Sequence, residues 1–548
     1  MKHLLLDVNI ILDLWLERQN CRLAEKLIED AGTVGAMLWF SSSSIPTLKY
    51  VFIHALKKEG ATENEARGIC RKLFEVLFEF ARPLTNAGYT QYDLMAKATD
   101  IEDAQIAMAM SCLHGEKCIV THDATFDNLG LVDCLTVADA LKWIDKEHLT
   151  AKEDSQIPFI DLATQQDTIR PQLEKNIHTV LRHGRYILGP EVQELEKRLC
   201  EYTGAKHCVG VSSGTDALLM ALMAWKIGPG DAVFTTPFTF IATAEIIQLL
   251  GATPVFVDID PRTFNLDPKK LALAIEAVTK NDPKIHPLPN PAPQASLTPK
   301  AIIPVDLFGL PADYDPIMVL AEKYGLKVLS DSAQGFGSEY KGKKSGTLGH
   351  ATATSFFPAK PLGCYGDGGA IFTDDDTLAV TLESIRTHGK GRDKYDNIRT
   401  GLNARLHTLQ AAILLAKLEI FPDELAAKQK AADQYTMLFK NRDSALRPPH
   451  IPEGMKSAWA QYSLMAESNE QRNVIQAFLK EGGVLSMVYY PKPLHMQTAF
   501  SRLGYGKEDF PISVETSTKI FSLPIHGYMQ SDVIQKIADI FAESLPLV

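Results

Sequence analysis

The chain has 548 residues, of which 45% are hydrophobic and 22% are charged, and its formal net charge is −11. This is an ordinary globular composition with ample core, and the length corresponds to about three to four domain-sized units. The negative charge argues against an extended surface for nucleic-acid phosphates, and no apolar run approaches the ~18–20 residues that span a bilayer. The cysteines form no Cys-x-x-Cys pair, so we expect reduced thiols, as in a cytoplasmic protein. We also expect no membrane partner.

Carboxylates in the first 145 residues lie at expected strand ends and at a helix start. A short strand ends at Asp7, and a second strand, which begins at Cys118, ends at Asp123. Between them, a helix is expected to start at Asp100 and Asp103. At one edge of a parallel sheet, such groups can hold Mg²⁺ or Mn²⁺ for phosphodiester hydrolysis. The order resembles an α/β PIN domain, the nuclease module of many toxins, and implies Asp7, Asp103 and Asp123 as metal ligands with Asp100 as a fourth acid.

This region departs from the PIN pattern at one position. PIN domains have an acidic residue where the helix after the second strand opens, whereas Thr47 or a near neighbour takes that place here and Lys49 adds a positive charge. A PIN fold without nuclease activity is therefore an open alternative, in which Asp7 and Asp123 only cap strand ends. We expect no nucleic-acid partner other than RNA at this domain.

Two polar stretches interrupt the chain. Residues 146–158 end in proline and separate two patterned regions, and residues 280–300 are rich in proline and asparagine, as in an exposed inserted loop. From 208 to 373, short apolar strands alternate with helices, which predicts a mostly parallel sheet covered by helices. After about residue 425 the pattern becomes mixed α+β. The expected parts are a PIN-like domain (1–148), a linker (149–156), a large domain (157–425) and a small C-terminal domain (426–548).

An anion site is expected where the strand at 209–211 meets a helix. The intervening residues 212–215 are Ser-Ser-Gly-Thr, and the apolar run 217–225 reads as the helix. Unpaired backbone N–H groups at a helix N-terminus, with hydroxyls beside them, bind anions such as phosphate. An ordinary Ser/Thr cap is the plainer alternative.

Two further residues suit pyridoxal phosphate (PLP). The strand 328–331 ends in Asp331, and a buried aspartate is the usual group that keeps the PLP ring nitrogen protonated, although Asp331 could also cap the following turn. Lys360 lies just past an apolar strand and before a glycine-rich stretch. A desolvated lysine has a lowered pKa and can form a Schiff base with an aldehyde. An isolated lysine in such a loop is more often a surface cation, so the order of the motifs carries the prediction.

Two weaker motifs complete that order. Residues 236–243 include aromatic side chains that could stack on a cofactor ring, although most such phenylalanines are core. Residues 401–406 open a further helix. From about residue 157 to the C-terminus the chain resembles the DegT/DnrJ/StrS-type sugar-nucleotide aminotransferases of the fold-type I PLP superfamily.

This resemblance implies roles for individual residues. Lys360 would be the Schiff-base lysine, Asp331 would face the pyridine nitrogen, and Gln334 would bond the ring hydroxyl. Gly214, Thr215 and Ser355 would hold the phosphate, and Phe240 would stack on the ring. Asn403 would reach the phosphate of the partner subunit, which implies a homodimer.

Within the family, the stretches 354–373 and 403–415 are most similar to WbpE-type enzymes. These aminate UDP-3-keto-N-acetylglucosaminuronate with glutamate as donor, for surface polysaccharides. Arg405 and Tyr490 match positions that contact the sugar nucleotide. Tyr489 stands where that subgroup tends to have histidine near the sugar carboxylate, so a neutral keto-sugar remains an alternative substrate. A different class of function is a metal-dependent ribonuclease whose C-terminal region is only a scaffold.

Overall fold

The computed structural model describes residues 2–16, 21–33, 36–41, 44–58, 60–84, 116–121, 133–136, 139–140, 157–290, 296–393, 395–441 and 446–544. The predicted linker 149–156 and the centre of the proline-rich loop, residues 291–295, lie outside these ranges. The chain divides into two compact units, Met1–Ser155 and Gln156–Val548.

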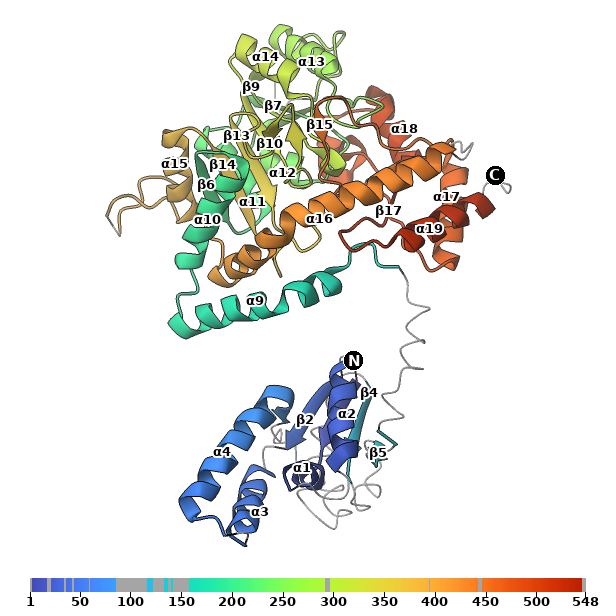
Figure 1. Cartoon of the computed structure of the whole chain (residues 1–548). Coiled ribbons are helices and arrows are strands. Elements are labelled where there is room, and N and C mark those ends of the chain that lie inside the picture. The colour runs from blue at the N-terminus through green and yellow to red at the C-terminus, as the bar shows by residue number, and fades with distance from the viewer. Residues whose placement is uncertain are drawn as a thin grey trace, which may run out of the picture. The chain divides into compact units, whose positions relative to one another are not determined.

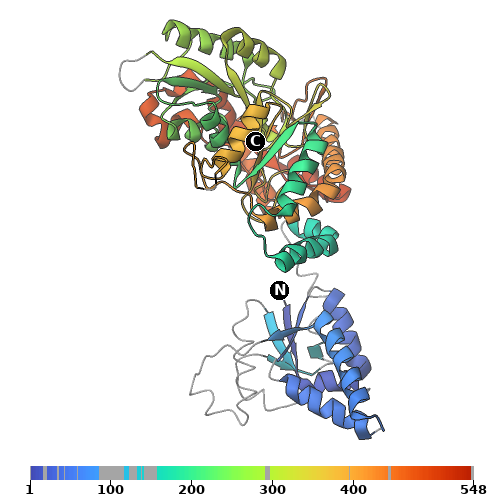
Figure 2. The same cartoon turned by 90° about the vertical axis from the view of Figure 1, so that its left-hand side faces the viewer.

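The N-terminal unit has a five-stranded sheet with the order β3-β2-β1-β4-β5, in which every pair of neighbours is parallel (Figure 2). Its strands are β1 (Lys2–Leu6), β2 (Met37–Ser41), β3 (Arg82–Leu84), β4 (Glu116–Val120) and β5 (Asp133–Leu135), and its helices are α1 (Val8–Trp15), α2 (Cys21–Thr33), α3 (Ser44–Lys58) and α4 (Glu63–Phe80). Leu4, Leu5 and Leu6 are all buried, because a central parallel strand is covered on both faces. The predicted α/β class of this region is confirmed.

The C-terminal unit is built on a seven-stranded sheet with the order β6-β14-β13-β10-β9-β7-β8 (Figure 1). The strands are β6 (His207–Val211), β7 (Asp231–Thr235), β8 (Thr253–Phe256), β9 (Thr298–Ile303), β10 (Lys327–Asp331), β13 (Ala351–Ser355) and β14 (Gly369–Thr373). β14 runs antiparallel to both of its neighbours, and the other pairs are parallel. The prediction of a mostly parallel sheet is thus confirmed, with β14 as the exception that makes the sheet mixed.

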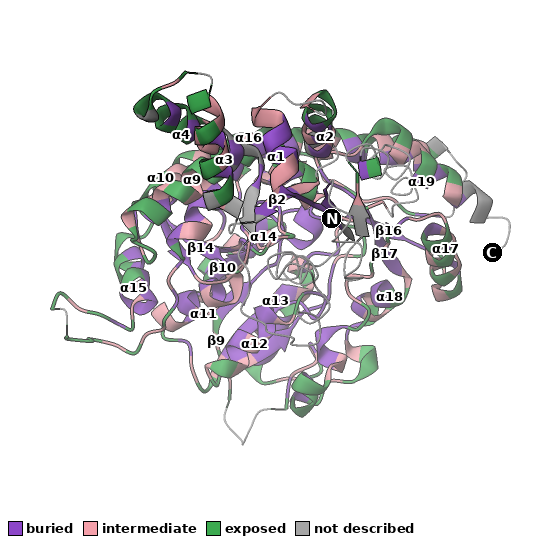
Figure 3. Ribbon diagram, turned by 90° about the horizontal axis from the view of Figure 1, so that it is seen from below, coloured by how far each residue is buried: buried purple, intermediate pink, exposed green. Residues whose placement is uncertain are grey.

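Helices cover both faces of this sheet. They are α10 (Pro190–Thr203), α11 (Gly214–Ala224), α12 (Ala242–Leu249), α13 (Pro268–Lys280), α14 (Tyr314–Tyr324) and α15 (Asp376–Arg386), and α9 (Leu162–His183) precedes them in the chain. Ile371 of β14 packs in the core under α11 and α15, whereas its neighbours Ala370 and Phe372 pack on the opposite face with α10. This alternation is the two-residue period of a strand. The outer faces of α10, α13, α14 and α15 are exposed, whereas α11 has no exposed residue (Figure 3).

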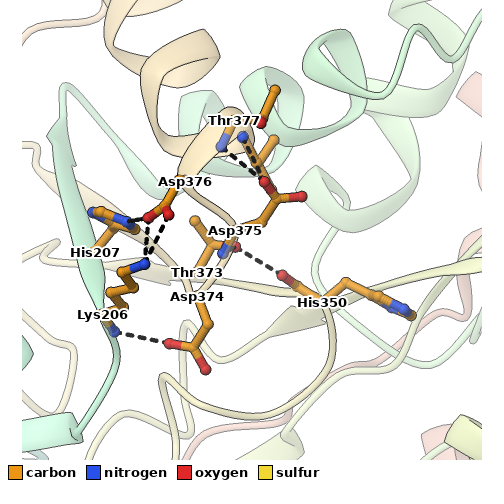
Figure 4. A network of polar contacts seen from close by, with 9 residues as sticks. Lys206, His207, His350, Thr373, Asp374, Asp375, Asp376 and Thr377 are labelled. Carbon is orange, nitrogen blue, oxygen red and sulfur yellow. Dashed lines mark hydrogen bonds and ion pairs between the residues drawn. The ribbon is translucent and has the colours of Figure 1, made fainter.

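A polar cluster fixes the turn from β14 into α15 (Figure 4). Asp375 caps the helix by accepting hydrogen bonds from the backbone of Thr377 and Leu378. Asp376, in the first turn, accepts from Lys206 and from His207, which lies 2.6 Å away at the start of β6. Because carboxylates are favourable at a helix N-terminus, one turn both starts α15 and joins β14 to the edge strand.

The long helix α16 (Thr408–Asn441) connects the sheet to the C-terminal part, and α9 packs along it (Figure 1). This part contains α17 (Asn469–Glu481), α18 (Pro511–Lys519), α19 (Ser531–Ser544) and strands β16 (Tyr462–Met465) and β17 (Ile520–Leu523), with the short strands β11 (Glu339–Tyr340), β12 (Lys343–Lys344) and β15 (Met455–Lys456) forming a separate sheet. Short 3-10 turns are η2 (Leu307–Gly309), η3 (Leu494–Met496), η4 (Thr498–Leu503) and η5 (Lys507–Asp509). α16 runs through position 425, the predicted boundary between the large and small domains.

The first described residues of the C-terminal unit pack with its last part. Ile157 bridges to Val484 in parallel and contributes to the core formed by α16, α17 and α19. Phe159 then contacts the ring of Tyr489 edge-on. Residues 157–161 therefore form an arm along the small C-terminal part before α9 begins. Among the described residues, no helix is both long and apolar enough to cross a membrane.

Candidate active site

Ends of neighbouring strands meet at one edge of the large sheet. β10 ends at Asp331 and β13 ends at Ser355, whose register partner on β14 is Gly369. Gly369 in turn pairs with Val211, the last residue of β6. Open α/β sheets bind ligands at such carboxyl ends.

The N-terminus of α11 forms a tight cradle against β13. Ser213 caps the helix by accepting from the backbone of Asp216 at 3.0 Å. A Cβ atom at Gly214 would lie 2.6 Å from Cβ of Ser355, so only glycine permits this approach. The N–H groups of Gly214 and Thr215 belong to the first turn, where no carbonyl group of the helix can accept from them. The cradle therefore presents free N–H groups beside the Ser355 hydroxyl, as an anion site requires.

Lys360 follows β13 in a loop that folds back on itself. Its N–H donates to the carbonyl of Phe357 at 2.8 Å, and a Cβ atom at Gly363 would lie 2.4 Å from the carbonyl oxygen of Pro358. Burial lowers the pKa of the Lys360 amine, and the charge of Asp331 partly opposes this shift. The loop thus holds a desolvated amine near a buried carboxylate.

Asp331 is buried and has few donors of its own. Its carboxylate accepts from Oγ1 of Thr243 at 2.7 Å and from the backbone of Ala333 at 3.2 Å. Burial raises the pKa of this carboxyl group. A cationic ring nitrogen placed against it would favour the ionised form and offset that cost. Thr243 was not singled out in the sequence, although it lies at the end of the 236–243 motif.

Gln334 is held between a backbone group and a tyrosine. Its Oε1 accepts from the N–H of Phe308 at 2.7 Å, and its Nε2 donates to the hydroxyl of Tyr490 at 2.9 Å. Phe308 has φ of 59°, a left-handed conformation that costs free energy for a bulky residue. Asn265 secures this turn by accepting from Leu307 N–H and donating to Leu310. No sequence pattern indicated this support.

The remaining predicted residues lie around these groups. Phe240 is 55% exposed, and Tyr489 is half-buried next to Tyr490. Asn403 is exposed and its side-chain oxygen accepts from Nε of Arg405 at 2.9 Å. The backbone of Arg405 forms an antiparallel β-bridge with Val211, and the carbonyl of Ala404 accepts from the backbone N–H of Ser212. This segment therefore runs beside the end of β6.

The residues predicted for a metal site are only partly described. Asp100, Asp103 and Asp123 lie outside the described residues, which contain no group of three or more potential metal ligands. Asp7 caps α1 by accepting from Val8 at 2.7 Å, and it also accepts from Oγ1 of Thr121 at the end of β4. Burial raises the pKa of Asp7. Thr47 and Lys49 are exposed on α3, whose first turn has no acidic residue.

The chain was compared with known proteins. A family model described as "DegT/DnrJ/EryC1/StrS aminotransferase family" matches residues 167–542. The chain belongs to this family. It is 48% identical over 381 residues to UDP-2-acetamido-2-deoxy-3-oxo-D-glucuronate aminotransferase of Pseudomonas aeruginosa, covering 70% of this chain and 98% of that protein.

Solved family members share the fold. A DegT/DnrJ/EryC1/StrS aminotransferase from Brucella abortus has a TM-score of 0.66 and 46% identity, covering 71% of this chain and 99% of its own. A putative sugar aminotransferase from Streptococcus pneumoniae, in a PMP form, has a TM-score of 0.62 and 27% identity over 69% and 98% of the two chains. The C-terminal unit is thus a fold-type I, PLP-dependent sugar aminotransferase. Its cradle, buried carboxylate and desolvated lysine fit that cofactor.

Proposed function

We propose that this aminotransferase aminates UDP-3-keto-N-acetylglucosaminuronate, with glutamate as donor, for surface polysaccharide biosynthesis. The observation that carries the proposal is the 48% identity, over nearly the whole of the relative, to an enzyme named for that sugar. The substrate class, a nucleotide-linked keto-sugar, agrees with the family as a whole.

Each part of the site has a proposed role in holding PLP. Gly214, Thr215 and Ser355 hold the phosphate at the N-terminus of α11, where the helix dipole favours a dianion. Asp331 faces the ring nitrogen, and Gln334 faces the ring hydroxyl. PLP, when bound, supplies an electron sink that stabilises negative charge on the carbon next to the amine.

Lys360 has two proposed tasks. Its lowered pKa provides a free amine for bonding to the cofactor, and the same Nζ later carries a proton to and from the substrate carbon. Asp331 keeps a proton on the ring nitrogen through its negative charge. Phe240, exposed at the start of α12, covers the ring by stacking.

Residues for the sugar and for the second subunit are proposed from their positions. Arg405, Tyr489 and Tyr490 contact the sugar nucleotide, and Asn403 reaches the partner's phosphate in a homodimer. The exposure of Asn403 in the single chain supports that role. Mixing Asn403→Ala with Lys360→Ala subunits would restore one intact site per mixed dimer. We expect activity to recover, whereas no recovery after proven subunit exchange would contradict a shared site.

The substrate is tested by direct competition. We expect kcat/KM for the uronate to exceed that for the neutral UDP-3-keto-N-acetylglucosamine. Replacing Tyr489 by histidine would add a positive charge close to the carboxylate of the uronate and should increase the preference for the uronate over the neutral sugar. If the neutral sugar reacts as well as the uronate, and Tyr489→His changes nothing, the neutral keto-sugar is the substrate.

For the N-terminal unit we propose a PIN-like domain with weak nuclease activity or none. The all-parallel sheet and the adjacent positions of Asp7 and Thr121 at the ends of β1 and β4 support the fold. The missing acid in α3 removes ligand charge for Mg²⁺ or Mn²⁺. A fragment of residues 1–148 should cleave RNA little at millimolar metal. Robust cleavage that vanishes in Asp7→Asn would contradict this expectation.

A further inference from the structure

A pocket that the roles above do not use adjoins Lys360. It is lined by the Lys360 loop, by the arm and first turn of α9 (160–165), by α16 and by residues 525–528. Its empty space, part of which is open to solvent, is about 460 Å³. Of the residues assigned to PLP or the sugar nucleotide, Lys360 alone is among its lining residues.

The acidic side chains of this pocket already accept hydrogen bonds from the protein. Glu424 of α16 is buried, and each of its carboxylate oxygens accepts from Nε2 of Gln165 at 2.9 Å. The hydroxyl of Tyr528 also donates to Glu424 at 2.7 Å. Asp161 accepts from the backbone and hydroxyl of Thr164 as the cap of α9. Both carboxylates therefore have donors from the protein itself.

The cationic and imidazole groups lack such partners. Lys428 lies one turn beyond Glu424 and interacts with its charge, but within the described part of the chain its ammonium group makes neither a close ion pair nor a hydrogen bond. His526 is 7% exposed, and neither of its ring nitrogens has a hydrogen-bond partner there. Burial lowers the pKa of both groups, and the charge of Glu424 at Lys428 and that of Asp161 at His526 only partly oppose these shifts. Buried polar groups in native proteins normally have partners, so a ligand is expected.

We infer that Lys428 and His526 bind a carboxylate of the amino-acid donor. A donor whose nitrogen reaches Lys360 carries one carboxylate on the adjacent carbon and, if it is glutamate, a second one at the end of its side chain. A neighbouring pocket in which an ammonium group and an imidazole N–H lack hydrogen-bond partners within the described residues suits such a group. This inference rests on the proposed function, because it assigns the donor to the same site.

The first test measures binding without chemistry. Glutarate has two carboxylates but no amine, so it cannot react, and its affinity for the holoenzyme can be measured by calorimetry. We expect Lys428→Met and the near-isosteric Lys428→Gln to weaken glutarate at least about tenfold, as the loss of a charge-assisted hydrogen bond predicts. Lys428→Arg should remain within about threefold of the parent. Lys430→Met, at an exposed position on the same helix, is the matched control.

The second test distinguishes the carboxylate of the amino-acid donor from that of the keto-uronate as the group that binds in the pocket. Rapid-mixing absorbance follows each half-reaction alone: glutamate with one cofactor form, and the keto-uronate with the other. Lys428→Met should raise the half-saturating glutamate concentration at least about tenfold and leave that of the keto-uronate unchanged. An effect on the uronate instead, or no loss of glutarate binding, overturns the inference. A colourless parent protein that transfers no amino group would instead show that the proposed function has failed.

Discussion

Asp7 in the N-terminal unit directly follows a strand of a parallel sheet, and Asp331 in the C-terminal unit ends a strand of a largely parallel one. Burial raises the pKa of both carboxyl groups. Their surroundings differ. Asp7 accepts from Val8, Asn9 and Thr121, which are all neutral donors of its own unit. Asp331 has neutral donors too, but it also interacts with the charge of Lys360. The comparison teaches that a strand-end aspartate becomes a candidate catalytic group through what the fold places opposite it.

The largest effect on this comparison is expected from removing the Lys360 side chain. Lys360→Ala should lower transamination by more than about four orders of magnitude, because both the cofactor bond and the proton carrier are lost. Lys300→Ala, at an exposed position, should change the rate little. Steady-state assays of the two variants measure the difference. Substantial activity in Lys360→Ala would end the assignment.

The same substitution in both units sharpens the comparison. Asp331→Asn should slow the chemical step by several orders of magnitude, because the ring nitrogen loses the charge that keeps it protonated. Asp7→Asn should leave the step unchanged. Single-turnover rates decide between them. A change of less than about tenfold in Asp331→Asn, or about 1.4 kcal/mol, would show that another group faces the ring.

Two glycines test the phosphate cradle. Gly214→Ala forces a Cβ atom to within 2.6 Å of Ser355, so PLP affinity should fall by about ten- to a hundredfold. Gly228→Ala meets nothing nearer than the Leu250 carbonyl oxygen at 4.0 Å and is the control. Absorbance titration of cofactor-free protein gives both affinities. Equal affinities would contradict a phosphate site at the N-terminus of α11.

The C-terminal unit should also lose stability in mild acid. Burial lowers the pKa of His495 and of His526 from 6.5 to about 4. Between those values the unfolded chain binds protons that the folded chain does not, so stability is full above pH 6.5 and falls toward pH 4. The loss is at most about 3 kcal/mol per histidine. The free energy of unfolding, measured in urea, should fall more steeply between pH 6.5 and pH 4 in the parent than in His495→Gln. Identical pH profiles would contradict the burial of His495 in its neutral form.

The smallest effect is expected from removing the N-terminal unit. A fragment of residues 157–548 should keep the transamination rate of the full chain within about twofold, because each unit has its own core. Activity and cofactor content of the purified fragment measure this. If a folded fragment were inactive, the N-terminal unit would have to contribute to the aminotransferase.

Local sequence signals predicted much of the candidate site. The strand ends at Asp331 and Ser355, the helix start at Gly214 and the lysine loop could be read because each combines an apolar strand with a turn. The β14 reversal was not predicted, since Gly369–Thr373 has the same apolar pattern as its parallel neighbours. Strand direction depends on the path of the connecting chain, which residue patterns do not record.

Long-range support could not be predicted. Phe308 reaches Gln334 only because the turn after Asp306 takes a left-handed conformation that an aromatic residue rarely adopts. The pocket beside Lys360 joins Gln165, Glu424 and His526, which are far apart in the chain. Their sequence neighbourhoods are ordinary helix and loop. Only the folded packing brings them together.

Identification of the lysine that carries the cofactor is the most direct test of the central claim. Borohydride reduction makes the bond between lysine and cofactor permanent, and peptide mass mapping then locates it. Lys360, Lys417 and Lys428 all have a pKa lowered by burial, that of Lys417 to about 8, so all three are chemically plausible carriers. The account predicts a yellow protein labelled on Lys360 alone. A label on Lys417 or Lys428, or a colourless protein that takes up no PLP, would contradict it.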